Sequence, residues 1–196
     1  EALLRLGCRA FAYVGASELP FMRFHSDERA RHFCKALQAA GSSAQTILID
    51  NRQLAQFLTD LPKPAGIFAY NDRIAAALLK AIRSLRLKVP DQIAIIGVDN
   101  DPDICTNTHP ALSSIDLDFE SAGLFAVKLL EHEFSGRKSR LRMVFGFRGV
   151  VHRESTTSSK TGGRTIARAR EIIRQNYARR LTLNSIAGEL RISPRL

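Results

Sequence analysis

The sequence lacks any run of the roughly 18 to 20 consecutive apolar residues that a membrane-spanning helix needs, so it predicts no transmembrane segment. It also lacks a basic and then apolar leader, although its first residue is Glu rather than Met. Cysteine is scarce, and the three thiols show neither CxxC nor zinc-ligand spacing: Cys8, Cys34 and Cys105. This count and spacing argue against a disulfide framework and predict reduced, mostly buried thiols in a cytoplasmic protein.

Sequence signatures of catalysis are missing as well. There is no HExxH, GxSxG or P-loop pattern. The histidines are dispersed without the spacing of metal ligands, at positions 25, 32, 109, 132 and 152. We therefore expect no enzyme activity, no cofactor and no metal ion. A sugar-modifying enzyme remains a rival class, but it would need catalytic residues that the sequence does not bring together.

Positive charge is distributed unevenly along the 196 residues. Residues 1–155 contain 20 Lys and Arg against 17 Asp and Glu, whereas residues 156–196 contain 9 against 2. Such asymmetry predicts a polyanionic partner for the C-terminal part. The alternative is a solvated basic helix face that binds nothing.

Short apolar runs alternate with amphipathic segments through most of the chain. The apolar runs predict buried strands over 8–15, 46–49, 65–70 and 93–98. The amphipathic segments predict helices over 26–41, 52–61, 72–85 and 119–134. In the first helix, Ser26 suits the N-cap and Gly41 suits the C′ position. This alternation predicts an α/β fold with a parallel sheet covered on both faces, closed by strands within 143–153.

The C-terminal part has a different composition. Small polar residues fill 155–163, STTSSKTGG, as is typical of a linker. Residues 164–196 then predict a helix, a short break and a second helix. We therefore expect an α/β domain over 1–154, a linker, and a small basic helical unit.

An acidic cluster, Asp99, Asp101 and Asp103, follows the fourth predicted strand. An EF-hand calcium loop would place its Gly at Ile104 and its bidentate Glu at Pro110, so both of these elements are missing. Acid–base catalysis would need partner groups that the sequence does not supply. The third interpretation is recognition of a polar ligand by Asp99, with Asp101 and Asp103 as solvated loop residues.

Two other polar residues are expected near Asp99. Asn71 directly follows the third predicted strand, and Arg29 lies in the first turn of the first predicted helix. In open parallel sheets, ligands bind beyond the carboxyl ends of the strands, so these three residues should face one cleft. A carboxylate, an amide and a guanidinium together offer the donors and acceptors that neighbouring hydroxyls require. Asn71 and Asp99 could equally cap the turns that follow them, and the pattern leaves both interpretations open.

Four ordered segments resemble motifs of LacI/GalR-type regulators, whose ligand-binding core is similar to periplasmic sugar-binding proteins. They are RARHFCKAL (29–37), FAYND (68–72), VPDQIAIIGVDND (89–101) and PALSSIDLDFESAG (110–123). The resemblance implies a two-lobed core of which the first domain holds mostly one lobe. It also implies that Arg29, Asn71 and Asp99 contact a sugar. Phe119 would stack on this sugar, or would be a core residue instead, because two alanines share its helix face.

The tail, RTIARAREIIRQNYARRLTLNSIAGELRISPRL, resembles the opening of an AraC/XylS-type DNA-binding domain. Thr182 can cap a helix whose apolar face comprises Leu183, Ile186, Ala187 and Leu190. The resemblance implies a helix-turn-helix whose turn and recognition helix include Arg191, Ser193, Pro194 and Arg195. Phosphate contacts are expected from Arg164, Arg168 and Arg179.

A LacI-like core followed by an AraC-like module is the arrangement of xylose-operon activators. We therefore expect a transcription regulator that binds a sugar effector such as a pentose, binds a double-stranded DNA operator, and forms a homodimer when intact. The alternative is a sugar-binding protein of a transport system, which would have no use for a basic tail. The resemblance further implies that the chain begins near the middle of the core and ends inside the recognition helix. These residues alone are therefore expected to bind neither ligand nor operator tightly.

Overall fold

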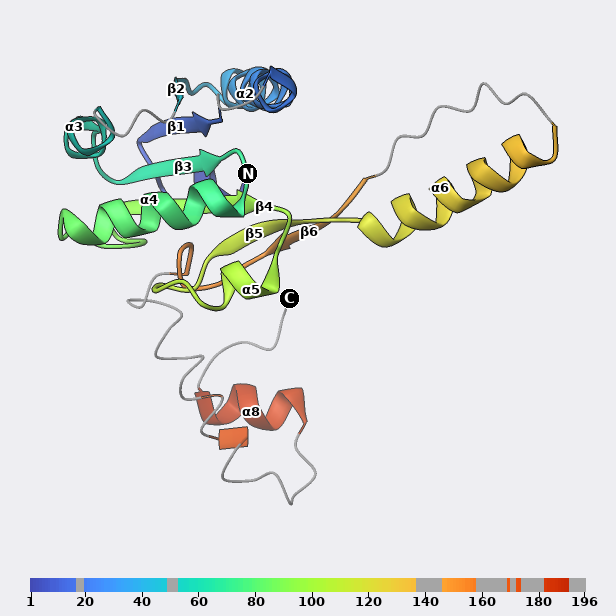
Figure 1. Cartoon of the computed structure of the whole chain (residues 1–196). Coiled ribbons are helices and arrows are strands. Elements are labelled where there is room, and N and C mark those ends of the chain that lie inside the picture. The colour runs from blue at the N-terminus through green and yellow to red at the C-terminus, as the bar shows by residue number, and fades with distance from the viewer. Residues whose placement is uncertain are drawn as a thin grey trace. The chain divides into compact units, whose positions relative to one another are not determined.

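The computed structural model describes residues 1–16, 20–48, 53–136, 146–157, 169, 172–173 and 182–190. The chain divides into two compact units, Glu1–Thr156 and Thr157–Leu196. The first unit is built on a six-stranded sheet with the strand order β2-β1-β3-β4-β5-β6 (Figure 1).

The strands follow the alternation of the sequence. They are β1 (Ala10–Gly15), β2 (Ala44–Leu48), β3 (Ala65–Ala69), β4 (Ile93–Val98), β5 (Ser113–Leu117) and β6 (Phe147–Val151). β1 to β5 run parallel, and β6 pairs antiparallel with β5. The predicted α/β class with a mostly parallel sheet is therefore confirmed. β5 was not predicted as a strand, because its sequence SSIDL alternates too little and is mostly polar.

One helix precedes the first strand, and the other helices of the first unit lie between successive strands. The helices are α1 (Ala2–Arg5), α2 (Pro20–Ala39), α3 (Leu54–Asp60), α4 (Asp72–Ser84), α5 (Pro102–Cys105) and α6 (Phe119–Phe134). α4 and α6 match their predicted bounds to within one residue. α1 and α5 were not predicted, because four residues are too few to show helical periodicity.

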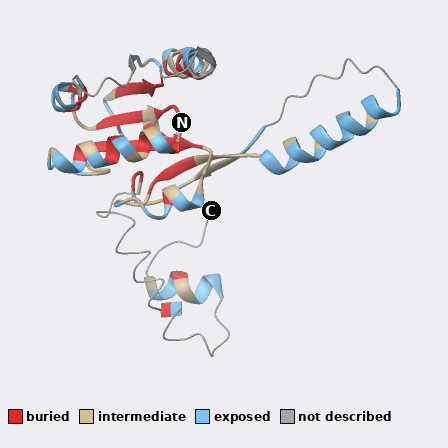
Figure 2. Ribbon diagram, viewed as in Figure 1, coloured by how far each residue is buried: buried red, intermediate tan, exposed pale blue. Residues whose placement is uncertain are grey.

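Alternate residues of β4 pack on opposite faces of the sheet, as the pleat of a strand requires. Ile93 and Ile95 are fully buried in a cluster with residues of α3 and α4. Ala94 and Ile96 are buried in a second cluster with residues of α1 and α2. Figure 2 shows the central strands as buried. Since both faces are covered, the strand is apolar at every position, and each buried isoleucine contributes about 1.5–3 kcal/mol.

Helix α2 begins at Pro20, well before its predicted start. Ser26 was predicted as the N-cap, but it lies inside the helix and is fully buried. Its Oγ accepts a hydrogen bond from the main-chain N–H of Ala16 (3.1 Å) and lies 3.3 Å from the hydroxyl of Tyr13. The Ser26 hydroxyl therefore joins α2 to β1 instead of capping a helix. The predicted C-terminus is confirmed, because Gly41 adopts φ +72° just beyond the helix.

The segment after β6 returns to the sheet. Ser155 Oγ donates a hydrogen bond to the carbonyl of Ile95 (2.7 Å) and accepts one from Ser113 N (2.8 Å). Thr156 Oγ1 lies 2.7 Å from Ser113 Oγ. Ser155 and Thr156, which the composition placed in the linker, are thus buried parts of the first unit.

The three cysteines are free thiols. The prediction that most of them are buried is wrong, because only Cys105 is buried while Cys8 and Cys34 are partly exposed. Burial raises the pKa of the Cys105 thiol to about 12 and that of Cys8 to about 11. Both thiols therefore stay protonated near neutral pH and are poor nucleophiles.

No side chain of α6 is buried, although this helix carries several large apolar residues. Leu124, Val127, Leu130 and Phe134 each expose more than half of their surface. Among the described helices, none is long and apolar enough to span a membrane.

In the second unit, the described structure centres on helix α8 (Leu183–Leu190). Thr182 caps it as predicted, because Thr182 Oγ1 accepts a hydrogen bond from Ser185 N (3.1 Å). Ala187 is buried as expected, whereas Leu183 is 68% exposed and does not belong to the buried face. The residues predicted to contact DNA all lie outside the described residues: Arg164, Arg168, Arg179, Arg191, Ser193, Pro194 and Arg195.

Candidate functional site

Three parallel strands present their carboxyl ends at one edge of the sheet. β1 and β4 both pair with β3, with Val14 opposite Ala69 and Phe68 opposite Ile96. The residues that follow the carboxyl ends of these strands therefore lie side by side. Tyr70 is fixed further, because its main-chain N–H donates to the carbonyl of Val14 (2.9 Å).

Arg29 reaches this edge from α2. Its Nη1 donates a hydrogen bond to the main-chain carbonyl of Tyr70. The guanidinium carbon also lies 4.8 Å from the centre of the Tyr70 ring, within the range of a cation–π contact. One turn earlier on the same helix, the buried Ser26 anchors α2 to β1. Arg29 therefore lies well inside α2 and not in its first turn as predicted, and Tyr70 holds its side chain at the edge of the sheet.

Asn71 directly follows Tyr70 and is the N-cap of α4. Its Oδ1 accepts a hydrogen bond from the main-chain N–H of Ile74 (3.0 Å). The capping interpretation of Asn71 is therefore correct. It does not exclude a ligand, because the amide group has two N–H donors besides this oxygen.

Asp99 follows β4 in a backbone conformation that L-amino acids rarely adopt. Its φ is +106°, and φ of Asn100 is +53°. Two consecutive non-glycine residues with positive φ store strain that tends to mark functional sites, typically 1–3 kcal/mol each. Asp99 is held in place through its main-chain N–H, which donates to the carbonyl of Ile115 (3.0 Å).

The carboxyl of Asp99 is in an environment that disfavours its charge. Burial is the main cause of its raised pKa, and nearby Asp72 and Asp101 raise it further. Arg29 acts in the opposite direction and lowers the Asp99 pKa, so the two side chains lie close enough to interact. The structure thus brings Arg29, Asn71 and Asp99 together at one edge.

The other two acids of the cluster have different roles. Asp101 was expected to be a solvated loop residue, but it is partly buried and caps α5, since its Oδ1 accepts a hydrogen bond from Asp103 N (2.9 Å). Asp103 is exposed, as expected of a solvated residue. Within the described ranges, no three His, Cys, Asp or Glu side chains are arranged to hold a metal ion.

Asp72 is a buried carboxylate that we did not single out from the sequence, although it belongs to the FAYND segment. It is 1% exposed and accepts three hydrogen bonds. The donors are Ser114 Oγ (2.5 Å), Asp101 N (2.9 Å) and Cys105 Sγ (3.3 Å). Asp72 therefore ties the Asp99–Asp101 loop to α4 and β5, and its role is to position that loop.

Arg153 supports the same loop from the far end of the first unit. Its Nη2 donates to Asn100 Oδ1 (2.8 Å), and its Nη1 donates to the carbonyl of Leu112 (2.9 Å). These bonds hold Asn100 in its strained conformation. Nothing near Arg153 in the sequence signals this role.

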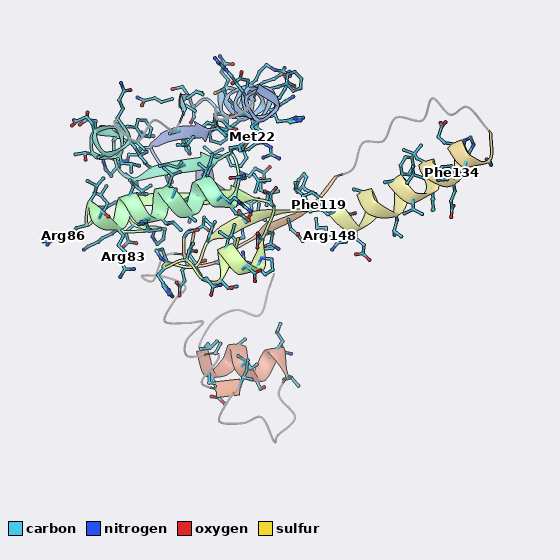
Figure 3. The ribbon with its side chains drawn as sticks, viewed as in Figure 1. Met22, Arg83, Arg86, Phe119, Phe134 and Arg148 are labelled. Carbon is cyan, nitrogen blue, oxygen red and sulfur yellow. The ribbon has the colours of Figure 1, made fainter. Side chains whose placement is uncertain are left out.

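Phe119 is the first residue of α6 and follows β5, the neighbour of β4. Asp118 caps this helix, and Arg148 Nη2 bonds both Asp118 Oδ1 (2.9 Å) and Glu120 Oε2 (2.7 Å). Figure 3 shows Phe119 and Arg148 at the start of α6. Phe119 is 53% exposed. It is therefore not a core residue of the described structure.

Comparison with known proteins places this geometry in a family. Residues 1–156 match the sequence model of the periplasmic binding protein-like domain. The chain is 28% identical over 151 residues to the xylose operon regulatory protein of Haemophilus influenzae. The aligned region covers 76% of this chain and 39% of that protein. It is also 33% identical over 168 residues to the HTH-type transcriptional regulator GntR of Pseudomonas aeruginosa. That aligned region covers 80% of this chain and 47% of that protein. The chain thus spans less than half the length of these relatives.

Solved structures agree on the fold. A LacI family transcriptional regulator from Arthrobacter sp. FB24, in complex with lactose, has a TM-score of 0.67 at 31% identity; the match covers 80% of this chain and 61% of that one. A xylose-binding transcription activator has a TM-score of 0.69 at 24% identity; the match covers 97% of this chain and 53% of that one. The mostly parallel sheet is therefore that of a LacI-type, periplasmic-binding-protein-like fold.

Proposed function

Because this chain belongs to the periplasmic binding protein-like family, we propose that it is part of a sugar-responsive DNA-binding transcription regulator. The observation that carries the proposal is the edge formed by Arg29, Asn71 and Asp99. The Arg29 guanidinium is held by Tyr70, and it is near enough to the half-buried Asp99 carboxylate for its charge to lower the pKa of that group. Such a pair presents an acceptor and a fork of donors in fixed positions.

A polyol fits these groups better than a purely apolar ligand. Asp99 would accept hydrogen bonds from sugar hydroxyls, while Arg29 and the amide of Asn71 would donate to them. Phe119 would pack its ring against the C–H face of the sugar. The relatives support a sugar, since one is a xylose operon regulator and one similar structure holds lactose.

We assign the effector to the pentoses, and the regulator to activation through an AraC-type helix-turn-helix. Both assignments rest on the resemblance of the tail and on the xylose operon regulators among the relatives. The match to the xylose-binding activator extends over 97% of this chain, against 80% for the LacI family regulator. The match to the activator therefore extends beyond the first unit, which supports the same order of the two domains along the chain.

The tail would bind the operator through its basic residues. Arg191, Ser193, Pro194 and Arg195 would contact DNA from the turn and the recognition helix, while Arg164, Arg168 and Arg179 would contact phosphates. Sugar binding would favour one arrangement of the sugar-binding lobes and so change how the paired tails of a cytoplasmic homodimer meet two half-sites.

The test is a titration of the full-length protein with a panel of pentoses and hexoses, followed by operator binding at two salt concentrations. We expect saturable binding of one pentose at least about tenfold tighter than glucose, and operator affinity that falls steeply with salt. If the protein binds sugar but shows no salt-dependent affinity for DNA, it is instead a sugar-binding protein of a transport system. A protein that binds none of the sugars contradicts the proposed function.

A further inference from the structure

A pocket of about 430 Å³ lies at the opposite edge of the sheet from the candidate sugar site. It is formed where α4 ends, where the chain enters β4, and where the loop before β5 passes. Its floor is apolar, with Leu79 and Ile82 buried and Leu87, Val89 and Pro110 partly exposed. This volume is in the range of pockets that bind small molecules.

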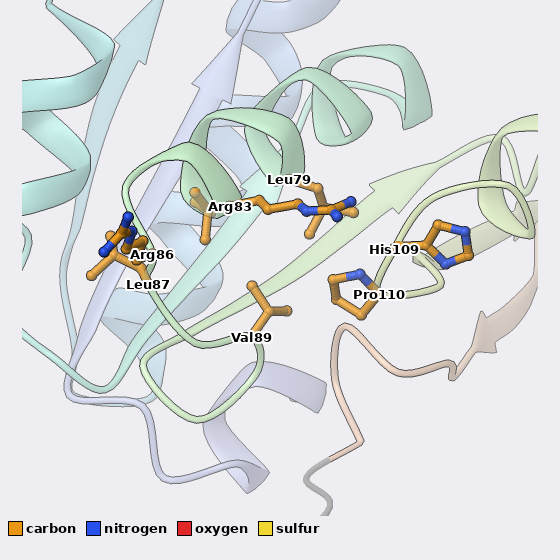
Figure 4. Close-up of a pocket in the computed structure, with 8 residues that line it drawn as sticks. Leu79, Arg83, Arg86, Leu87, Val89, His109 and Pro110 are labelled. Carbon is orange, nitrogen blue, oxygen red and sulfur yellow. The ribbon is translucent and has the colours of Figure 1, made fainter.

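The rim of this pocket carries only basic polar groups. Arg83, Arg86 and His109 line it, and no acidic residue does. In Figure 4, Arg83 stretches from α4 towards His109, and Arg86 lies on the other side beside Leu87. No ion pair joins Arg83 or Arg86 to a carboxylate among the described residues. Glu154, the acid next to the loop, already accepts the main-chain N–H of Ala111 (2.9 Å).

The backbone holds Arg86 at the rim at an energetic cost. Arg86 has φ +56°, at the position after a helix where glycine is preferred. Its N–H donates to the carbonyl of Arg83 (3.0 Å), and Leu87 N donates to the carbonyl of Ile82 (3.1 Å), which completes a Schellman motif. A glycine would make the same turn with less strain but would remove the guanidinium. The chain thus keeps a positive charge where local structure favours glycine.

The end of α4 does not cancel this charge. The partial negative charge of a helix C-terminus resides on its last carbonyl groups. Three of these, on Ala81, Ile82 and Arg83, accept main-chain hydrogen bonds within the turn. Arg83 and Arg86 are exposed, so two guanidiniums beside an apolar floor leave a positive site at the surface.

We propose that this pocket binds a small amphipathic anion, in which a carboxylate, sulfonate or phosphate is attached to an apolar body. The anionic group contacts Arg83 and His109, which approach each other on one side of the pocket, and the positive charge of Arg86 attracts it from the other side. The apolar body covers Ile82, Leu87 and Val89. This site is independent of the sugar site at the other edge of the sheet.

The test uses 8-anilinonaphthalene-1-sulfonate as the anionic probe and N-phenyl-1-naphthylamine as its neutral counterpart. Both are titrated by fluorescence into the 196-residue chain and into three variants: Arg83→Gln, Arg86→Gly and Arg73→Gln. Arg73 lies on α4 outside the pocket and serves as the matched control.

We expect Kd of the anionic probe to rise at least fivefold in Arg83→Gln and in Arg86→Gly and to stay within twofold in Arg73→Gln. The neutral probe should bind all four proteins alike. Arg86→Gly should also melt at the same or a higher temperature than the parent chain, because glycine relieves the turn. Weaker anion binding with equal or greater stability separates a ligand contact from a structural role. Equal affinity for the anionic probe in all four proteins, or no saturable binding, overturns the proposal.

Discussion

Arg29 on α2 donates a hydrogen bond to the main-chain carbonyl of Tyr70, the residue that directly follows β3. The guanidinium also lies over the ring of the same residue. These two contacts fix the side chain at the edge of the sheet, where its charge lowers the pKa of the Asp99 carboxyl. A donor group that is ordered before the ligand arrives loses less entropy on binding.

Arg29→Lys should weaken sugar binding by the full-length protein by at least about tenfold. An ammonium cannot bond the Tyr70 carbonyl, lie over its ring and present a second donor in the same plane. Stability should fall by only about 1 kcal/mol, the value of one hydrogen bond. The matched control is Arg31→Lys on the exposed side of α2, where Arg31 pairs with Glu28. If calorimetry gives the same sugar affinity for both variants, Arg29 does not belong to the site.

Gly97→Ala should destabilise the first unit severely. A Cβ at Gly97 would lie 2.1 Å from Asp72 Oδ1 and 3.2 Å from the Asp72 Cα. Asp72 cannot move aside, because its carboxylate is buried and bonded to Ser114, Asp101 and Cys105. We expect a loss of about 3 kcal/mol, the upper range for overpacking.

Gly123→Ala is the control for this substitution, because nothing lies within 4 Å of a Cβ there. It lies within α6 and should stabilise the chain by up to about 1 kcal/mol. Urea unfolding of both variants measures the difference. Similar free energies of unfolding for the two would mean that Asp72 and Gly97 are not in close contact.

Asp72 should make stability depend on pH. Burial raises its folded-state pKa above the ordinary value, in spite of its three hydrogen bonds. The folded protein then binds the proton more tightly than the unfolded chain. Its contribution to stability is complete below the ordinary Asp pKa of about 4 and is lost as the pH rises through the raised pKa.

Asp72→Asn removes this titration. It also weakens the hydrogen bonds to the Asp99–Asp101 loop, because an amide NH2 group replaces one of the two accepting carboxylate oxygens. The free energy of unfolding, measured by urea from pH 4 upwards, should decline less with pH in the variant than in the parent chain. Parallel pH profiles would show that the Asp72 carboxyl does not carry a raised pKa.

Much of the fold could be predicted because short local sequence patterns encode buried strands and amphipathic helices. The run over 93–98 is apolar at every position because residues alternate between two covered faces. The start of α2 was mispredicted because Ser26 has the local properties of a cap, whereas tertiary packing uses its hydroxyl to bond β1.

The candidate site could be predicted where a strand end determines the position of a side chain. Asn71 is the second residue after β3 and Asp99 directly follows β4, so topology alone places them at the same edge. The supporting residues depend on contacts distant in sequence. Arg153 bonds Asn100 across 53 positions, and Asp72 bonds Ser114 across 42. No local pattern encodes such pairs.

The most direct test of the sugar site is Asp99→Gly in the full-length protein, with sugar affinity and melting temperature measured on the same preparation. Glycine adopts the φ of +106° without strain and removes a carboxyl whose charge is disfavoured by burial. We predict that affinity for the best-binding sugar falls at least about tenfold, while the melting temperature stays equal or rises. Unchanged sugar affinity in Asp99→Gly would contradict the account.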